Sequence, residues 1–161
     1  MKKILWILPI LCLLCGCAMQ MSEERKEYQA GVRQLEEKKV KNFDKELPFE
    51  IEVSIDSLVE GELVYSVVID QPKVPMKNIK ALVVHDAKTT DIFPSVGIFD
   101  TPLNLIPNEV DQEKKNVKGI ALVGYIETDK SVGAFHMNVR VLVSYEDEEG
   151  NRHQLYSYHK I

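Results

Sequence analysis

The sequence predicts an all-β fold over residues 47–161, in which antiparallel strands form a β-sandwich of two sheets. Three observations support this prediction. The segment 49–56 (FEIEVSID) alternates apolar and polar side chains, which is typical of a strand with one buried face. Further apolar segments follow with turns between them, giving about six to eight strands in about 115 residues. The last two segments, 133–147 and 151–161, have the pattern of a β-hairpin.

The first sixteen residues have the pattern of a cleaved secretory signal. Lys2 and Lys3 precede an apolar run, Ile4 to Leu14, which is 11 residues long. At about 1.5 Å per residue, this run is too short to cross a hydrocarbon core of about 30 Å. A positive start, a short apolar middle and a small residue before the cut indicate a secretory signal rather than a membrane-spanning helix.

The apolar run ends in Leu14-Cys15-Gly16-Cys17, which resembles the lipobox of bacterial lipoproteins. The resemblance implies cleavage between Gly16 and Cys17 and attachment of a diacylglycerol to the sulfur of Cys17. Cys15 departs from the small residue that is usual at its position, and we interpret Cys12 and Cys15 as apolar positions of the signal. The processed chain would then have no free thiol, no disulfide and no cysteine metal ligand.

The charge of the processed chain limits its partners. Removing Lys2 and Lys3 takes the formal net charge from −5 to −7. An acidic body attracts neither nucleic acid nor an anionic lipid surface, so we expect no nucleic-acid partner. The membrane contact is expected through the lipid on Cys17. The expected location is the extracytoplasmic face of the cell membrane, or the outer membrane if the source is Gram-negative.

Residues 17–46 differ in composition from the rest, because they are charged and consist mostly of helix-forming residues. Ser22 can start a helix, on which Tyr28, Val32 and Leu35 form one thin apolar stripe. We interpret this segment as the lipid anchor followed by a charged, partly helical tether, a solvated spacer that holds the domain off the membrane. The alternative is a helix that binds a partner.

Three further strands are expected at residues 62–70, 78–86 and 117–128, where apolar side chains recur. Gly119 and Gly124 in the last of these indicate a bulge or a close backbone contact. The passage 87–116 between the second and the third is irregular and contains several prolines. Short strands are expected there around Ile92 and Leu103.

The final hairpin has a defined register. Asp147 facing Asn151 leaves a three-residue loop that ends in Gly150, which suits a type I turn closed at positive φ. The same register places the residues of one strand opposite those of the other, in the pairs Val143–Leu155, Leu142–Tyr156, Arg140–Tyr158, Val139–His159 and Met137–Ile161. The architecture over 47–161 resembles immunoglobulin-like and fibronectin type III-like domains, without the Cys…Trp…Cys pattern of antibody domains.

Chemistry-bearing motifs are few. The sequence contains no Gly-x-Ser-x-Gly, Ser-x-x-Lys or His-Glu-x-x-His motif and no glycine-rich phosphate loop. Asp86, Asp91 and Asp100 are candidates for a divalent-metal site, because carboxylates and backbone carbonyls at one end of a sandwich suit Ca²⁺. Their spacing matches no established calcium loop, and the expectation is that the protein has no cofactor.

Two surfaces are candidates for binding a partner. The loop 92–99 carries Phe93 and Phe99, which either cap the open end of the core or contact a partner. The outward face of the hairpin carries Arg140, Leu142, Tyr156 and Tyr158. Tyrosine with arginine is typical of interfaces, and it is equally an ordinary cross-strand pairing that the tether's apolar stripe could cover. Both alternatives stay open for both surfaces.

The sequence therefore predicts a lipid-anchored, extracytoplasmic binding or assembly module of the bacterial cell envelope, which is not an enzyme. Its expected partner is another envelope protein. The alternative is a divalent-metal-dependent envelope enzyme, or an enzyme subunit, that uses the loop from Asp86 to Asp100.

Overall fold

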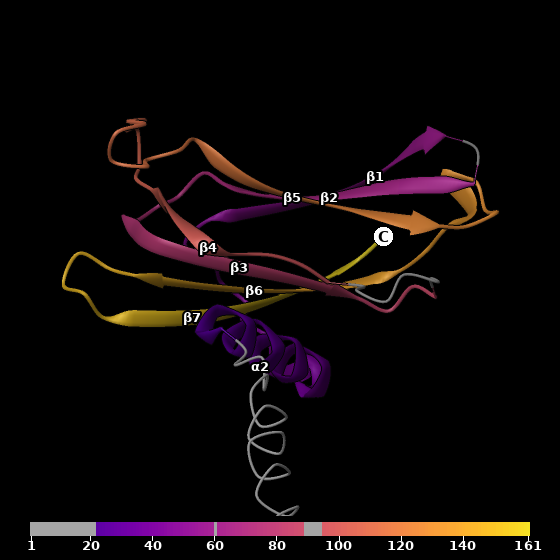
Figure 1. Ribbon diagram of the computed structural model, residues 1–161, viewed down its shortest axis with the longest axis horizontal. Helices are drawn as coiled ribbons and strands as arrows, with labels where there is room; N and C mark the ends of the chain where they lie inside the picture. Colours follow the sequence, from indigo (N-terminus) through magenta and orange to yellow (C-terminus); the bar gives the residue numbers. More distant parts are fainter. Residues whose placement is uncertain (1–21, 60, 89–94) are drawn as a thin grey trace, which may run out of the picture.

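The computed structural model describes residues 22–59, 61–88 and 95–161, which form one α-helix, two short 3₁₀-helices and seven β-strands (Figure 1). The signal segment and Cys17 lie outside the described residues. The helices are α2 (Glu23–Glu37), η2 (Val40–Asn42) and η3 (Val132–Ala134). The strands are β1 (Glu50–Val59), β2 (Glu62–Asp70), β3 (Met76–His85), β4 (Ser95–Leu105), β5 (Gly119–Glu127), β6 (Asn138–Glu146) and β7 (Arg152–Lys160).

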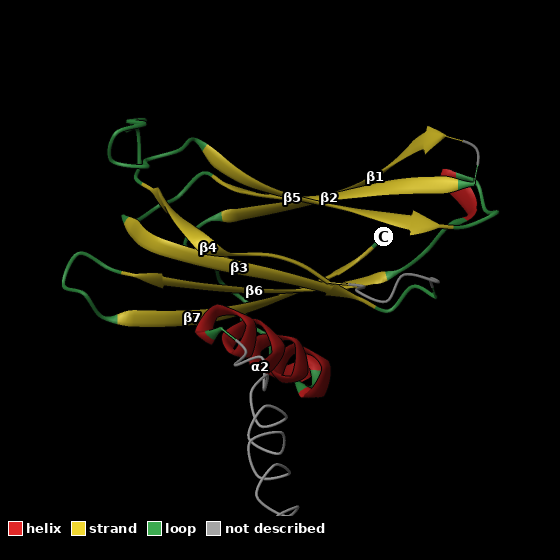
Figure 2. Cartoon of the chain, in the orientation of Figure 1, coloured by secondary structure: helices red, strands yellow, loops and turns green. Residues whose placement is uncertain are grey.

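The strands form two sheets that face each other, as Figure 2 shows. One sheet has three strands in the order β1-β2-β5, and the other has four in the order β4-β3-β6-β7. Every pair of neighbouring strands is antiparallel. The predicted all-β, antiparallel two-sheet sandwich is therefore confirmed.

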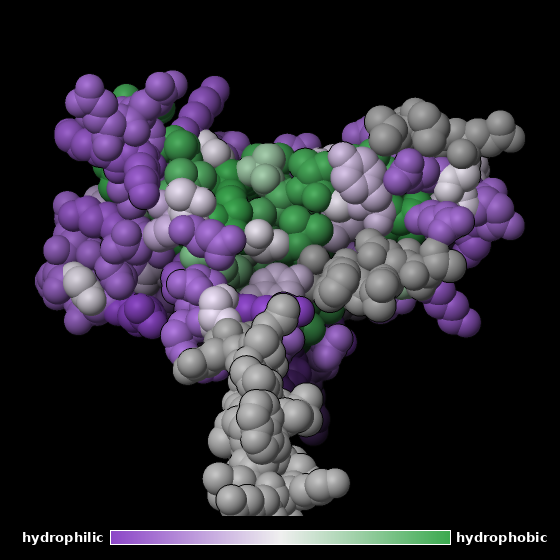
Figure 3. Space-filling model, viewed as in Figure 1, coloured by the Kyte–Doolittle hydropathy of each residue, from purple (hydrophilic) through white to green (hydrophobic). Residues whose placement is uncertain are grey.

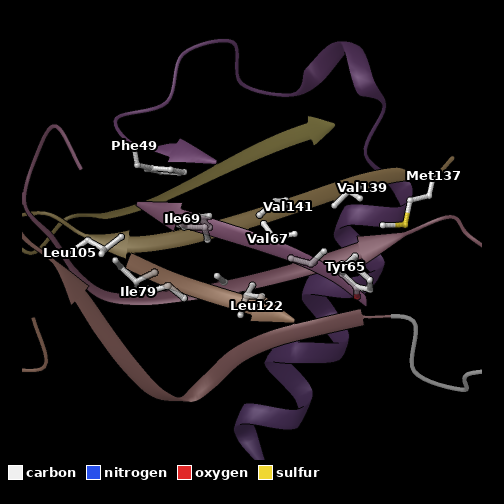
Figure 4. Close-up of a cluster of buried hydrophobic side chains, with 14 of the residues drawn as sticks. Phe49, Tyr65, Val67, Ile69, Ile79, Leu105, Leu122, Met137, Val139 and Val141 are labelled. Carbon is white, nitrogen blue, oxygen red and sulfur yellow. The ribbon is translucent and has the colours of Figure 1, made fainter. Parts of the chain in front are cut away.

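The core lies between the sheets and consists of the inward side chains of both (Figure 4). On β2, odd-numbered residues from Leu63 to Ile69 are buried and even-numbered ones are half-buried. Opposite them, Val139, Val141 and Val143 of β6 are fully buried. Each such aliphatic side chain contributes roughly 1.5–3 kcal/mol by leaving water, so this core is the main source of stability in a domain with no disulfide.

Tyr65 packs directly against Gly124. A Cβ atom placed on Gly124 would lie 2.4 Å from Cζ of Tyr65, which is too close for two non-bonded carbon atoms. The ring of Tyr65 is buried and lies against β5 at this point. Gly124 is therefore required for a close approach of side chain to backbone, one of the two alternatives that the sequence indicated.

The final hairpin has the predicted register. Val143 pairs with Leu155 and Val139 with His159, and the backbones of Met137 and Ile161 exchange hydrogen bonds of 2.9 and 3.1 Å. Gly150 closes the loop at a φ of +83°, and its N–H donates to the carbonyl of Asp147. A turn that only glycine adopts without strain thus sets which side chains of β6 and β7 face the core.

The strand expected around Leu103 is present after β3, and it is longer than expected. β4 is one strand through Pro102, and its pairing with β3 shifts register at two places, on either side of Ile79. Ile92 lies outside the described residues. Pro102 is tolerated because β4 is at the edge of its sheet, where an N–H is not needed for pairing on the outer side.

Candidate functional site

Helix α2 lies against the outer face of the four-stranded sheet (Figure 1). Ser22 caps its N-terminus, accepting a hydrogen bond of 3.3 Å from the backbone N–H of Arg25 at Oγ. Within the described residues, no helix is long and apolar enough to cross a membrane. The helix predicted at Ser22 is therefore present, but it is not a solvated spacer.

The apolar stripe of α2 forms a second cluster with the sheet. Leu35 is completely buried there, and Tyr28 and Val32 are partly buried. The sheet contributes outward-facing side chains of four strands: Leu82 and Val84 of β3, Phe99 of β4, Leu142 of β6 and Tyr156 of β7. The rings of Tyr28 and Phe99 meet edge to face with centroids 5.7 Å apart. Burial of this stripe, rather than helix propensity, holds α2 in place.

Polar contacts fix the orientation of the helix on the sheet. Nη1 of Arg140 donates hydrogen bonds of 2.9 and 2.7 Å to the carbonyl oxygens of Leu35 and Glu36. The last turn of α2 has no basic residue of its own, so Arg140 supplies the cation that the negative end of the helix favours. Lys80 of β3 forms an ion pair with Glu27 at the other end.

Tyr156 is the residue that the N-terminal segment contacts most. Its hydroxyl accepts a hydrogen bond from Nε2 of Gln34, and its backbone N–H donates to Oδ2 of Asp44 at 2.7 Å. The ammonium of Lys38 lies 3.6 Å from the ring centroid. Burial, with a contribution from the nearby Asp44 carboxylate, raises the pKa of Tyr156. Phe43 packs between Tyr156 and Tyr158, at ring-centroid distances of 6.3 and 6.0 Å.

The expected partner surface on the hairpin is therefore covered by the chain itself. Leu142 and Tyr156 are each only 6% exposed, and Arg140 and Tyr158 are half-buried. Phe99 is half-buried in the same cluster, and Phe93 lies outside the described residues. Of the alternatives left open for the hairpin face, the described residues favour internal packing. The helix and these side chains stabilise the domain rather than present it to a partner.

The aspartates that were candidates for Ca²⁺ are only partly within the described residues. Asp86 accepts hydrogen bonds of 2.7 and 2.6 Å from the backbone and side chain of Asn138. Burial alone would raise the pKa of Asp86, but these bonds more than offset it and the pKa is lowered. Asp100 is on β4, next to a position of β3 that is at least five residues from Asp86. The two aspartates are therefore on the order of 16 Å apart. Asp91 lies outside the described residues, within which no cluster of three or more metal-binding side chains occurs.

The half-buried and buried histidines have structural neighbours. His85 packs edge to face against Tyr65, and His153 stacks on Tyr145 at a centroid distance of 4.9 Å. Nε2 of His159 lies 2.6 Å from Oγ of Ser157, and burial lowers the pKa of His159. This bond joins two side chains two residues apart on β7, and Ser157 is buried.

A cavity of about 890 Å³ opens at the end of the sandwich where η3 lies. Its apolar wall is formed by Phe135, Met137 and Ile161. Its rim carries three lysines, Lys88, Lys130 and Lys160, and three acidic residues, Asp86, Glu127 and Asp129. The rim therefore carries equal numbers of basic and acidic residues. The cavity could not be predicted from the sequence, because its walls come from four separate segments.

The outer face of the three-stranded sheet exposes apolar side chains. Val123 and Tyr125 of β5 are 43% and 52% exposed, and Val64 and Val68 of β2 lie beside them, half-buried. The adjoining β1 presents acidic side chains, Glu50, Glu52 and Asp56. This face lies on the opposite side of the sandwich from α2 (Figure 1), so an apolar stripe with an acidic border points away from the segment that leads to Cys17.

Comparison with known proteins gives no relative: no protein-family model matches the chain, and no curated protein matches it either.

Proposed function

We propose that this chain is a lipid-anchored binding or assembly module of a bacterial cell envelope. A diacylglycerol on Cys17 holds it to the extracytoplasmic side of the membrane, and the outer face of the three-stranded sheet binds an envelope protein. The proposal for Cys17 is supported by the lipobox-like Leu14-Cys15-Gly16-Cys17 at the end of a short apolar run.

The observation that carries the proposal is the docking of α2. Because this helix begins at Glu23 and is packed on the sheet from Tyr28, only residues 17–22 are available to link the anchor to the helix. Six residues span at most about 20 Å when fully extended. The sandwich is then held close to the membrane instead of at the end of a long free tether, which favours recognition of a partner in or on the same membrane.

The exposure of side chains favours one face of the sandwich for binding the partner. The face that carries α2 is occupied by the chain's own side chains, whereas the opposite face exposes Val123 and Tyr125. Tyrosine and aliphatic side chains beside a charged border are the composition of a protein-binding surface. The module therefore presents its partner-binding face on the side away from the anchor.

Photo-crosslinking in living cells tests this proposal. Benzoylphenylalanine in place of Val64, at the centre of the exposed face, is expected to give adducts with an envelope protein. These adducts should be lost when Cys17→Ala releases the domain from the membrane. The same probe at Lys41, exposed on η2, is the control and should give no such adduct. Absence of adducts at position 64, or adducts that Cys17→Ala leaves unchanged, would contradict the proposal.

A further inference from the structure

The sandwich has four edge strands, and three of them are protected against pairing with another strand. The edges are β1 and β5 of one sheet and β4 and β7 of the other. β1 carries exposed acidic side chains and an irregular register near Val59, and β4 contains Pro102 and two register shifts. The edge of β7 is bound at its middle by Asp44, whose N–H donates to the carbonyl of Tyr156 at 2.9 Å. Charges, proline, irregular register and covering segments are the usual means of blocking an edge.

None of these protective features occurs within β5. Its nine residues pair with β2 in unbroken register, and the strand contains no proline, lysine or arginine. Its only charged residue is Glu127, the last one. Within the described residues, no strand pairs with its outer side. An open, regular and apolar edge of this kind is a template for another strand.

The backbone groups at this edge can be assigned. The N–H of Thr128 donates to the carbonyl of Gly61 at 3.0 Å, which makes this pair hydrogen-bonded. Hydrogen-bonded pairs alternate along an antiparallel ladder, so Ile126, Gly124, Leu122 and Ile120 bond to β2. Ala121, Val123 and Tyr125 therefore direct their backbone N–H and C=O groups outward, away from β2.

The sequence of β5 complements itself in the antiparallel direction. Val123 is the midpoint of the strand, so a twofold axis at Val123 gives full overlap from Gly119 to Glu127. Each Glu127 then faces Gly119 of the second copy, and no two like charges oppose each other. The other pairs are Ile120 with Ile126, Ala121 with Tyr125, Leu122 with Gly124, and Val123 with itself. Apolar and aromatic pairs directly opposite each other stabilise a sheet, whereas like charges destabilise it.

The region beside the edge is apolar as well. β4 contacts β5 from the other sheet and carries half-buried Val96, Ile98 and Leu103. Figure 3 shows apolar residues gathered in a band between the two sheets, in the part of the view where Figure 1 draws β5 and β4. A second copy joined at β5 would cover this band and add the burial that backbone pairing alone lacks.

We propose that β5 pairs antiparallel with β5 of a second copy about a twofold axis at Val123, which joins two three-stranded sheets into one sheet of six strands. This association does not depend on the lipid anchor. It leaves the outward face of the sheet, including Val64 at its centre, available to a different partner.

Disulfide trapping in the full chain tests the register. Cα atoms of a directly opposed, hydrogen-bonded pair lie about 5.5 Å apart, within the range of about 4.4–6.8 Å that a disulfide spans. Val123→Cys alone is expected to form a covalent dimer under mild oxidation in native membranes. Tyr125→Cys alone should form no covalent dimer, because residue 125 faces Ala121 of the second copy. A mixture of the Tyr125→Cys and Ala121→Cys chains should form one. The wild-type chain gives the background from its own cysteines, including Cys17 if it carries no lipid.

A second variant tests the association itself. Val123→Lys places two lysines opposite each other, and it removes little packing within one copy because the side chain is 43% exposed. It is expected to weaken the dimer about tenfold or more, as measured by light scattering after size-exclusion chromatography. Asp56→Lys, which adds a lysine to the other edge strand, should leave the dimer intact. A monomeric wild-type chain, an unaffected Val123→Lys dimer, or a Val123→Cys disulfide at background level would overturn the proposal.

Discussion

Arg140 of β6 donates a hydrogen bond of 2.9 Å to the carbonyl oxygen of Leu35, the completely buried residue of helix α2. The same guanidinium group binds the carbonyl of Glu36, so a residue 105 positions away in the sequence caps the C-terminal turn of the helix. This single side chain joins helix α2 to the centre of the four-stranded sheet.

Replacing Arg140 by methionine tests the cap. The variant keeps the apolar stem but loses both hydrogen bonds, and the free energy of unfolding is expected to fall by about 1–3 kcal/mol. Arg152→Met is the matched control, because Arg152 only forms an exposed ion pair of 3.7 Å with Glu146. Such pairs contribute less than about 1 kcal/mol. Urea unfolding measures both, and equal losses would show that Arg140 does not cap α2.

Gly31 tests how closely the helix must approach the sheet. A Cβ atom on Gly31 would lie 3.0 Å from Cδ2 of Leu82, a completely buried side chain with little room to move. Gly31→Leu is therefore expected to lift α2 from the sheet, whereas Gln29→Leu, on the exposed side of the helix, should not. Trypsin should cleave after Lys26 and Arg33 about ten times faster or more in the first variant. An unchanged cleavage rate would mean that α2 is not held by this contact.

Substitution of Gly124 tests its contact with Tyr65 in the main core. Gly124→Ala forces a methyl group onto the buried ring of Tyr65 and is expected to cost about 1–3 kcal/mol of stability. Gly133→Ala is the control, because a Cβ at Gly133 meets no atom within 4 Å. In a Tyr65→Leu background the same Gly124→Ala substitution should cost less, since the ring is no longer there. Equal thermal unfolding temperatures for the two single alanine variants would contradict this packing.

The turn before β7 predicts a pH dependence. A hydrogen bond with Nε2 of His153 at 2.8 Å, followed by bonds from Asn151, holds the pKa of Asp147 well below its usual range. A carboxyl whose pKa is lower in the folded state contributes stability above its unfolded pKa of about 4, and loses it as pH falls through the folded pKa. The urea concentration at the midpoint of unfolding should therefore be lower at pH 2.5 than at pH 5. Asp147→Asn should flatten this fall, and an identical slope in both proteins would be contrary to this assignment.

The parts of the fold that the sequence predicted are those set by local chemistry. Gly150 and the alternation of β6 and β7 specify the hairpin register without any knowledge of the rest of the chain. β4 could not be predicted in the same way. Its register shifts beside Ile79 and its proline break the period-two pattern, and only pairing with β3 makes it a strand.

The docking of α2 could be predicted only in part. The stripe Tyr28, Val32 and Leu35 is visible in the sequence, but its receiving surface comes from four strands whose order is not local information. One feature of the sequence does indicate that the outer face of β3 is covered. Residues 81–84 (ALVV) are a continuous apolar run, which is typical of a strand buried on both faces. β5 has a similar run but is exposed on one face, so the run alone does not identify the covered sheet.

The most direct test of the proposed lipid anchor is the intact mass of the protein extracted from its native membrane. The expected mass is that of residues 17–161 with a diacylglycerol thioether on Cys17, and the N-terminal peptide should carry this modification. Cys17→Ala should be found as an unmodified chain. A wild-type protein that begins at Met1, or that has an unmodified Cys17 and is recovered without membrane, would contradict the proposed function.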